Sequence, residues 1–373
     1  MSYICLPKMW VRNFEKDKMK YLINIGKNIF KSAFAAMIGG MVLTACNNDD
    51  DVTGNNGTIQ PDDTPKECVR PSFLQPGDKI AIVSPSYATD DATNQMGMEA
   101  IREMGFDPIL APNANNSYLV KYAGTAEERV SDLEWAYNNP EIKAIMCTRG
   151  GYGTIQLLPL LNPTLIRNNP KWLIGYSDIT TLLSFSVASA NVMAIHGTML
   201  SSLKKTMGKS EDDMMLRDML RGDMPHYEWQ SNAHPNRTGT ARGMLVGGNM
   251  CTFTPLIGSP YDFTSQGDII LFVEEIGENA RNIDRMMYSL KIHGVMPRVK
   301  GILVGDFAAC GDEFKIGSIE EMLDKYTLSE LQIPIAYGFR AGHAGVNWPL
   351  IEGSPVTLTV NTDRATLTLE TAI

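Results

Sequence analysis

The chain has 373 residues, of which 44% are hydrophobic and 20% are charged, a composition typical of globular proteins with one large or two medium domains. Its formal net charge is −9 and it has no cluster of lysines and arginines, which argues against nucleic-acid binding. The cysteines beyond residue 46 are far apart, without a CxxC pair, and no HExxH motif occurs. We therefore expect no disulfide framework, no metal site and no cofactor.

Residues 1–45 have the layout of a secretory signal peptide. From Met19 onward, Lys20, Lys27 and Lys31 precede an uncharged run of 14 residues, 32–45, which leads into "LTAC". The run is too short to span a bilayer comfortably, and small residues precede the expected cut. "LTAC" resembles a lipobox, in which Cys46 is lipidated and becomes the first mature residue. We expect an exported lipoprotein held to a membrane by its lipid, in the cell envelope (periplasm or outer membrane) of a Gram-negative bacterium. An uncleaved N-terminal anchor is the alternative.

The next segments predict a linker and a first α/β domain. Residues 46–75 are polar and rich in Asn, Asp, Thr and Pro, as linkers are. Ile- and Val-rich strands then alternate with helical patterns over 76–200, which indicates βαβ units on a parallel sheet. In chain order we expect a strand at 79–86, a helix at 93–106, a strand at 107–112, a helix at 125–140, strand, glycine loop and helix over 141–161, strand, turn and helix over 171–190, and a short strand at 192–200.

The remaining residues predict a helical connection over 201–238 and a second domain over 239–373. The expected strands of this domain are "GMLVGGN", "DIILFVEEI", "VKGILVGDF" and "IPIAYGF". A helix is expected over 278–296, and the segment 355–369 reads as a hairpin that turns at 361–363.

Ser177 lies where the buried strand "WLIG" gives way to a helix. A strand–Gly–x–Ser–helix turn exposes a serine hydroxyl at the top of a sheet, as a nucleophile elbow does. The match to GxSxG is incomplete because Ile179 occupies the second glycine position. A serine that caps the helix is the alternative interpretation.

The glycine loop "TRGGYG", residues 148–153, follows another buried strand. Adjacent glycines let backbone N–H groups point into a cavity, where they can stabilise an oxyanion. A phosphate loop or a plain tight turn are the alternatives, although no Walker lysine follows.

Two neighbouring glutamates and two histidines are further candidates for the site. Glu274 and Glu275 end a strand that otherwise reads as buried, and strand alternation places them on opposite sides. His343 lies in a glycine-containing loop and is a candidate base, with His196 in "AIHGTML" as its rival.

The ordered set of segments "IAIVSPS", "TRGGYG", "WLIGYSDIT", "HGTML", "GGN", "ILFVEEIGENARNIDRMM", "VKGILVGDF" and "GHAGVNWPL" resembles the serine LD-carboxypeptidase family. This family, also called murein tetrapeptide carboxypeptidases, includes microcin-immunity relatives. The resemblance covers about residues 76–360. It implies a Rossmann-like parallel-sheet N-terminal domain that carries the serine and a smaller β-rich α/β C-terminal domain that carries the glutamate and histidine. It also implies a homodimer.

The family's motifs match this sequence residue by residue. Its nucleophile in G-[YF]-S-D corresponds to Ser177, the glutamate of F-x-E-[DE] to Glu274, and the histidine of the G-H loop to His343. The backbone N–H groups of Gly151 and Asp178 correspond to its oxyanion donors. "HGTML" departs from the usual H-G-P-x form, with threonine in place of proline.

The resemblance implies a serine carboxypeptidase that releases the terminal D-alanine of murein tetrapeptides through a Ser-His-Glu triad and an acyl-enzyme. An exported protein would meet such muropeptides outside the inner membrane. One alternative is a same-fold hydrolase of another peptide-like amide, as in microcin immunity. Another is a non-catalytic peptide-binding lipoprotein, whose expected mark is loss of a triad residue.

Overall fold

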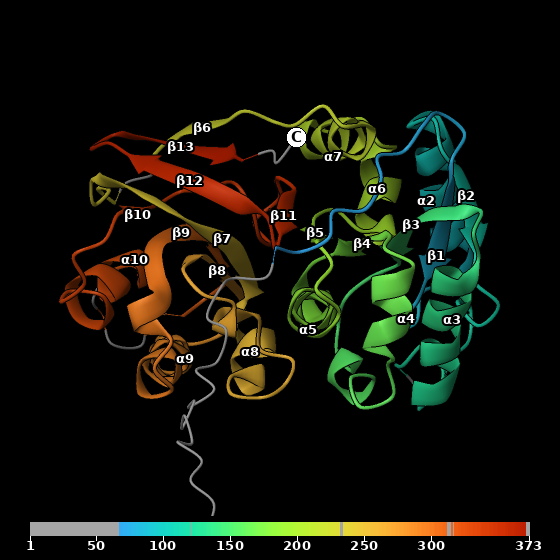
Figure 1. The fold of residues 1–373 in the computed structure, drawn as a ribbon, viewed down its shortest axis with the longest axis horizontal. Coiled ribbons are helices and arrows are strands. Elements are labelled where there is room, and N and C mark those ends of the chain that lie inside the picture. The colour runs from blue at the N-terminus through green and yellow to red at the C-terminus, as the bar shows by residue number, and fades with distance from the viewer. Residues whose placement is uncertain (1–66, 120, 232–233, 312–314, 316, 371–373) are drawn as a thin grey trace, which may run out of the picture. The chain divides into compact units, whose positions relative to one another are not determined.

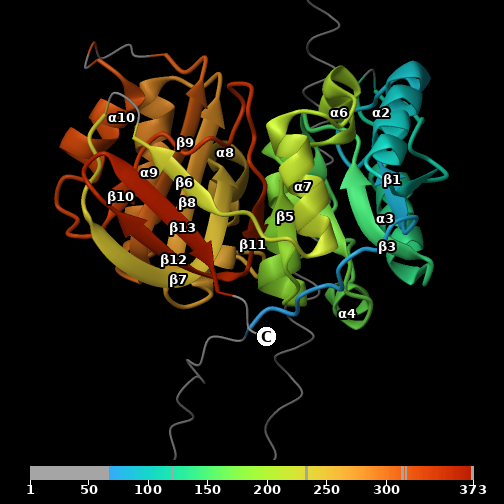
Figure 2. The same cartoon turned by 90° about the horizontal axis from the view of Figure 1, so that it is seen from above.

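The structure is a computed structural model that describes residues 67–370, except residues 120, 232–233, 312–314 and 316. Cys46, the predicted signal peptide and most of the predicted linker lie outside the described residues. The described part contains two β-sheets accompanied by helices (Figures 1 and 2). This architecture confirms the predicted α/β fold class.

The first sheet has six strands in the order β11-β5-β4-β3-β1-β2. The strands β1 to β5 are parallel to one another, as the alternating pattern predicts, whereas β11 is antiparallel to β5. The strands are β1 (Lys79–Val83), β2 (Asp107–Leu110), β3 (Ile142–Cys147), β4 (Trp172–Gly175), β5 (Ala194–His196) and β11 (Leu350–Glu352). The helices of this part are α2 (Asp91–Glu103), α3 (Ala126–Asn138), α4 (Pro163–Asn168), α5 (Thr180–Phe185), α6 (Leu200–Thr206) and α7 (Glu211–Arg221).

Local sequence signals explain where α3 begins and why another predicted helix is missing. The Thr125 hydroxyl accepts a hydrogen bond from the Glu128 N–H, and the Glu128 carboxylate accepts one from the Thr125 N–H, which forms a capping box. The prediction of a helix after the glycine loop is wrong. Only a 3-10 turn, Thr154–Gln156, forms there. Pro159 has no N–H to continue a helix, and its ring would clash with a carbonyl of the preceding turn.

The second sheet has seven strands in the order β10-β9-β8-β7-β12-β13-β6. β7 to β10 are parallel, whereas β12, β13 and β6 are added in antiparallel fashion. The strands are β6 (Tyr227–Gln230), β7 (Gly239–Asn249), β8 (Ile269–Ile276), β9 (Val299–Ala308), β10 (Ile335–Ala336), β12 (Pro355–Val360) and β13 (Arg364–Leu369). The helices are α8 (Met250–Phe253), α9 (Ala280–Ile292) and α10 (Ile319–Met322). The predicted hairpin is β12–β13.

Two strands differ from the predicted division of the chain. The segment 201–238 contains α6 and α7, but also β6, which pairs with β13 in the second sheet. β11 lies within the segment expected to form the second domain, yet it pairs with β5 in the first sheet. The chain therefore crosses between the sheets more often than a simple two-part division implies.

A single apolar cluster joins the two sheets. It contains Ile174 and Ile195 of the first sheet together with Leu245, Phe272 and Leu303 of the second, all fully buried. Burial of this kind contributes about 25 cal/mol for each Å² of apolar surface removed from water, so the two sheets stabilise each other.

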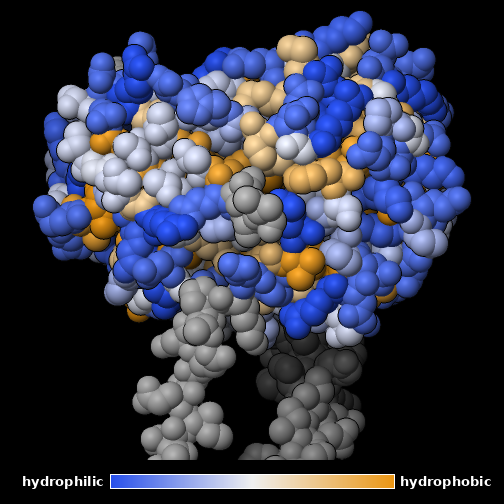
Figure 3. Space-filling view, turned by 45° about the horizontal axis from the view of Figure 1, so that its top comes forward, coloured by the Kyte–Doolittle hydropathy of each residue, from blue (hydrophilic) through white to orange (hydrophobic). Residues whose placement is uncertain are grey.

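Hydrophilic residues predominate on the face drawn in Figure 3, and hydrophobic residues gather near its middle. Among the described residues, an apolar hollow of about 590 Å³ lies near the start of β7 and the end of β13. None of its lining residues lines the cavity beside Ser177 described below.

Candidate active site

Ser177 occupies a strained turn between β4 and α5. Its φ of +63° is in the left-handed region, which is uncommon for a residue other than glycine. A Cβ at Gly175 would come within 2.7 Å of the Ile179 side chain, so glycine permits this tight turn. Neither the 3-10 turn Ser177–Ile179 nor α5 has a side-chain cap. The Ser177 hydroxyl is therefore not a helix cap in this structure.

The glycine loop lies directly beside Ser177. A Cβ at Gly150 would lie 3.0 Å from the Ser177 Cβ and 3.1 Å from its Oγ. Gly151 has a φ of +131°, and a Cβ there would come within 2.3 Å of the Tyr87 ring. Glycine is thus required at Gly151, and at Gly150 any larger residue would have to displace Ser177 slightly. Among the described contacts, the N–H groups of Gly151 and Asp178 donate no hydrogen bond to the protein, which leaves them available to a ligand.

The Asp178 side chain holds the serine turn against the glycine loop. Its Oδ2 accepts hydrogen bonds from the Ser86 hydroxyl, at 2.7 Å, and from the Thr154 N–H, at 3.1 Å. The Thr154 hydroxyl in turn donates to the Asp178 carbonyl at 2.7 Å. The ends of β1, β3 and β4 are thereby fixed relative to one another, as expected at the carboxyl edge of a parallel sheet.

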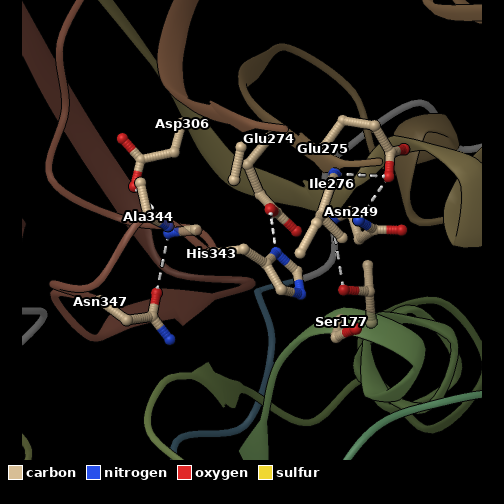
Figure 4. A network of polar contacts seen from close by, with 12 residues as sticks. Ser177, Asn249, Glu274, Glu275, Ile276, Asp306, His343, Ala344 and Asn347 are labelled. Atoms are coloured by element: carbon tan, nitrogen blue, oxygen red, sulfur yellow. Dashed lines mark hydrogen bonds and ion pairs between the residues drawn. The ribbon is translucent and has the colours of Figure 1, made fainter. Parts of the chain in front are cut away.

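Glu274, near the end of β8, is buried and contacts the mostly buried His343 from the loop between β10 and β11. His343 Nδ1 lies 2.7 Å from Glu274 Oε2, and the exposed fractions of the two side chains are 12% and 0% (Figure 4). His343 follows Gly342, whose φ is +134°. A Cβ at Gly342 would lie 3.2 Å from Glu274 Oε2, so glycine lets the loop pass close to the carboxylate.

Both residues next to His343 are held by side chains from elsewhere. The Gly342 N–H donates to Asn347 Oδ1 at 3.0 Å, and the Ala344 N–H donates to Asp306 Oδ2 at 3.2 Å. Burial raises the pKa of Asp306 above its ordinary value. These two bonds fix the backbone on either side of His343 and so restrict the position of its ring.

Glu275 points away from His343 and has different partners (Figure 4). Its carboxylate accepts hydrogen bonds from Asn249 Nδ2 at 2.9 Å, the Cys251 N–H at 2.7 Å and the Ile276 N–H at 2.9 Å. Burial raises its pKa, although these hydrogen bonds oppose the rise. Glu275 thus ties the end of β8 to the end of β7, whereas Glu274 alone of the two contacts His343.

Ser177 and His343 line one cavity of about 440 Å³, together with Gly150 and Gly151. The Tyr176 ring lies 5.0 Å from the His343 ring, between centroids. The Ser177 hydroxyl makes no hydrogen bond with His343 here. The three residues predicted as a triad (Ser177, Glu274 and His343) and the two predicted oxyanion donors (Gly151 and Asp178) therefore lie at one place, brought there from both sheets.

Models of two protein domains match the chain. The LD-carboxypeptidase N-terminal domain matches residues 80–197, and the LD-carboxypeptidase C-terminal domain matches residues 242–358. The chain belongs to the LD-carboxypeptidase family. It is accordingly a serine-type carboxypeptidase, as the resemblance predicts.

Relatives of this LD-carboxypeptidase match it over nearly their whole length. A putative carboxypeptidase of Synechocystis is 34% identical over 79% of this chain and 95% of its own. A probable murein peptide carboxypeptidase of Bacillus subtilis is 30% identical over 82% of this chain and 95% of its own. The solved structure of an MccF-like protein from Bacillus anthracis is 26% identical, with a TM-score of 0.69 over 81% of this chain and all of that one.

His196, the rival base in the sequence of the LD-carboxypeptidase, is fully buried and does not line the cavity with Ser177. Its Nε2 lies 3.0 Å from Asn347 Oδ1, the same oxygen that accepts from the Gly342 N–H. Burial lowers the pKa of His196 to about 4. His196 is thus neutral near pH 7 and, through Asn347, holds the loop that carries His343.

Sequence reasoning missed this supporting role of Asn347 in the LD-carboxypeptidase. Besides its bonds to His196 and Gly342, its N–H donates to Asp212 Oδ2 at 3.0 Å. Asn347 stands four residues after His343 in "GHAGVNWPL", and this closeness in sequence was the only feature that pointed to it. Its partners His196 and Asp212 are more than 130 residues away in sequence, so no local pattern could identify them.

The burial of His196 predicts a specific pH dependence of stability. The unfolded chain binds a proton at this histidine below about pH 6.5, whereas the folded LD-carboxypeptidase does so only near pH 4. The free energy of unfolding therefore decreases as the pH falls from about 6.5 to 4, and between pH 7 and 5 this group lowers it by about 2 kcal/mol. The His196→Asn variant should therefore lose about 2 kcal/mol less of its free energy of unfolding between pH 7 and pH 5 than the wild type does. Urea unfolding at both pH values measures this difference.

The matched control is His226→Asn, because the His226 side chain is 74% exposed and, among the described residues, its ion pair is with Glu228. That variant should keep the wild-type difference between pH 7 and 5. If His196→Asn and His226→Asn show the same difference, the neutral buried state assigned to His196 is wrong.

Proposed function

We propose that the protein hydrolyses the bond between the L-configured centre of a diamino acid and the terminal D-alanine of murein tetrapeptides. Ser177 is the nucleophile, His343 the general base and acid, and Glu274 the carboxylate that orients the histidine. The observation that carries the proposal is the 2.7 Å contact between His343 and Glu274. His343 lines the same cavity as Ser177, which lies in a strained turn and does not cap a helix. The likeness to a probable murein peptide carboxypeptidase supports the substrate class.

The pair of His343 and Glu274 determines which ring nitrogen faces the serine. An ionised carboxylate only accepts hydrogen bonds, so His343 Nδ1 carries the proton in its contact with Glu274. Nε2 then lacks a proton and can take one from the Ser177 hydroxyl as its oxygen attacks the carbonyl carbon. The positive charge that forms on the ring is stabilised by the Glu274 carboxylate.

The oxyanion formed by this attack is assigned to the N–H groups of Gly151 and Asp178. Backbone donors held in place in this way can contribute several kcal/mol to the stability of the transition state. His343 Nε2–H then gives its proton to the amine of D-alanine, which leaves, and the diamino acid remains as an ester on Ser177. Water, deprotonated by His343, hydrolyses this acyl-enzyme.

The test uses the purified protein and two synthetic tetrapeptides that differ only in the configuration of the terminal alanine. Mass spectrometry should detect release of alanine from the peptide with D-alanine, and little release from the peptide with L-alanine. The proposal is wrong if no D-alanine is released, or if the L-alanine peptide is cleaved as fast.

The second candidate function is hydrolysis of another peptide-like amide, such as a peptidyl or aminoacyl nucleotide. The similarity to an MccF-like protein of Bacillus anthracis favours it. Incubation of the same preparation with an aminoacyl nucleotide amide distinguishes the two functions. The substrate with the higher kcat/KM, the D-alanine tetrapeptide or the nucleotide amide, identifies the better assignment.

We also propose that the protein is a lipoprotein of the cell envelope, attached through Cys46. Within the part of the chain that the structure describes, no helix is long and apolar enough to cross a membrane. With the lipid chains as anchor, the polar segment 47–70 would hold the site a few tens of ångströms from the bilayer, at about 5–6 Å times the square root of its length. The homodimer stays a prediction from family resemblance.

Replacing Cys46→Ser should abolish labelling by a radioactive or clickable fatty acid and leave the signal segment uncleaved or the protein released from the membrane. Cell fractionation with immunoblotting measures both results. A Cys46→Ser protein that is still processed and still found in the membrane fraction would contradict the lipoprotein assignment.

A further inference from the structure

The cavity beside Ser177 carries positive charge in a protein that is acidic overall. Its lining includes Arg149, Lys204 and Lys205 and no Asp or Glu. The whole chain, by contrast, has 42 acidic and 33 basic residues. Three cations without a carboxylate next to the candidate nucleophile create a local field that attracts anions.

The three cations are held to different degrees. Lys204 Nζ donates to the Thr93 hydroxyl at 2.7 Å, which ties it to α2. The Arg149 guanidinium lies over the Tyr87 ring, 5.9 Å from its centroid. Lys205 is exposed and has no hydrogen bond or ion pair with any residue that the structure describes. It is therefore the cation most available to a bound ligand.

The neighbouring cavity has the opposite character and fixes where an anion can lie. This cavity, of about 270 Å³, shares Tyr176, His343 and Lys205 with the first. Its lining also includes the acidic residues Glu211, Asp212 and Asp213. A carboxylate is repelled by these acidic residues and attracted to the cavity that Lys205 lines together with Arg149 and Lys204. Ser177 lines the cavity that contains Arg149 and does not line the acidic one.

We propose that Lys205, assisted by Arg149, binds the free carboxylate of the terminal residue of the substrate and so makes the enzyme specific for chain ends. This inference rests on the proposed function, because the carboxylate belongs to the D-alanine that leaves. An internal peptide bond has no charge at this position. A substrate without the terminal carboxylate leaves the cations unpaired, and the enzyme discriminates against it.

The experiment combines two substrates with variants of one lysine. The substrates are the tetrapeptide with a free terminal carboxylate and the same peptide with a terminal carboxamide, and release of the terminal residue is measured as kcat/KM. The wild type should prefer the acid by about 10–100-fold, the range expected for one charge-assisted hydrogen bond. Lys205→Met should lose most of this preference because its kcat/KM for the acid peptide falls, while its kcat/KM for the amide peptide changes less than about threefold. Lys205→Arg should restore much of it.

The matched control is Lys209→Met, an exposed lysine that lines neither cavity. It should keep the wild-type preference. If Lys205→Met slows the acid and the amide equally, or if Lys209→Met reduces the preference as much, Lys205 does not read the carboxylate and the inference is overturned.

A binding measurement separates failure of this inference from failure of the proposed function. Isothermal titration of Ser177→Ala, with and without Lys205→Met, compares the affinity for the acid and the amide without any need for hydrolysis. If binding of the acid depends on Lys205 but the wild-type protein releases no D-alanine, the carboxylate site is supported and the proposed reaction is refuted. Release of D-alanine without any such preference in binding or rate would do the reverse.

Discussion

Replacing Ser177 by alanine should lower kcat for D-alanine release by about 10⁴–10⁶-fold, the loss usual when a member of a serine triad is removed. The residual rate should come from binding and from the oxyanion donors. The free energy of unfolding should change by less than about 0.5 kcal/mol, because the hydroxyl makes no hydrogen bond within the described part of the chain and neither following helix uses it as a cap. Steady-state kinetics and urea unfolding of the same preparations measure both quantities.

The control for Ser177→Ala is Ser201→Ala, since Ser201 lines the same cavity but belongs to α6. This variant should keep more than about a tenth of the wild-type rate. A Ser177→Ala enzyme that also keeps more than a tenth would show that Ser177 is not the nucleophile.

The second large effect separates the neighbouring glutamates by exchanging each for glutamine. Glu274→Gln should lower kcat by about 10²–10⁴-fold, because it removes the negative charge that stabilises protonated His343 and permits the wrong ring tautomer. Glu275→Gln should lower kcat by less than about tenfold. Each variant is the other's control, since both changes remove one carboxylate from the same strand end.

Stability should rank the two variants in the opposite order. Glu275 accepts three hydrogen bonds, and a glutamine would turn its NH₂ group towards one of the donors. An unpaired buried donor costs about 1–3 kcal/mol, so Glu275→Gln should be the less stable protein. If Glu275→Gln has the lower kcat/KM, the carboxylate that orients His343 is Glu275 and not Glu274.

The sequence carried enough information for the fold class and for most strands of both sheets. Long Ile- and Val-rich runs and the capping box at Thr125 are local signals, and each is strong. The ordered motifs also singled out Ser177, Glu274 and His343. Strand alternation alone could only say that Glu274 and Glu275 point in opposite directions, and the choice between them came from the family resemblance.

What the sequence could not reveal depends on contacts between distant residues. β11 has three residues, too few for a periodic pattern, and its partner β5 lies more than 150 residues earlier. The link from His196 through Asn347 to the loop of His343 likewise joins residues 151 positions apart. Such pairs are selected by the packing of the whole chain, which local propensity does not encode.

The crossing of β11 into the first sheet limits how far the two halves can be treated as modules. The segment 80–197 that matches the N-terminal domain ends before β11, so on its own it would leave the β5 edge unpaired. The loop with His343 runs from β10 in one sheet to β11 in the other. A hybrid enzyme that joins the front half of one relative to the back half of another would therefore have to match an edge strand as well as an interface. His343 would be the first group displaced by a poor match.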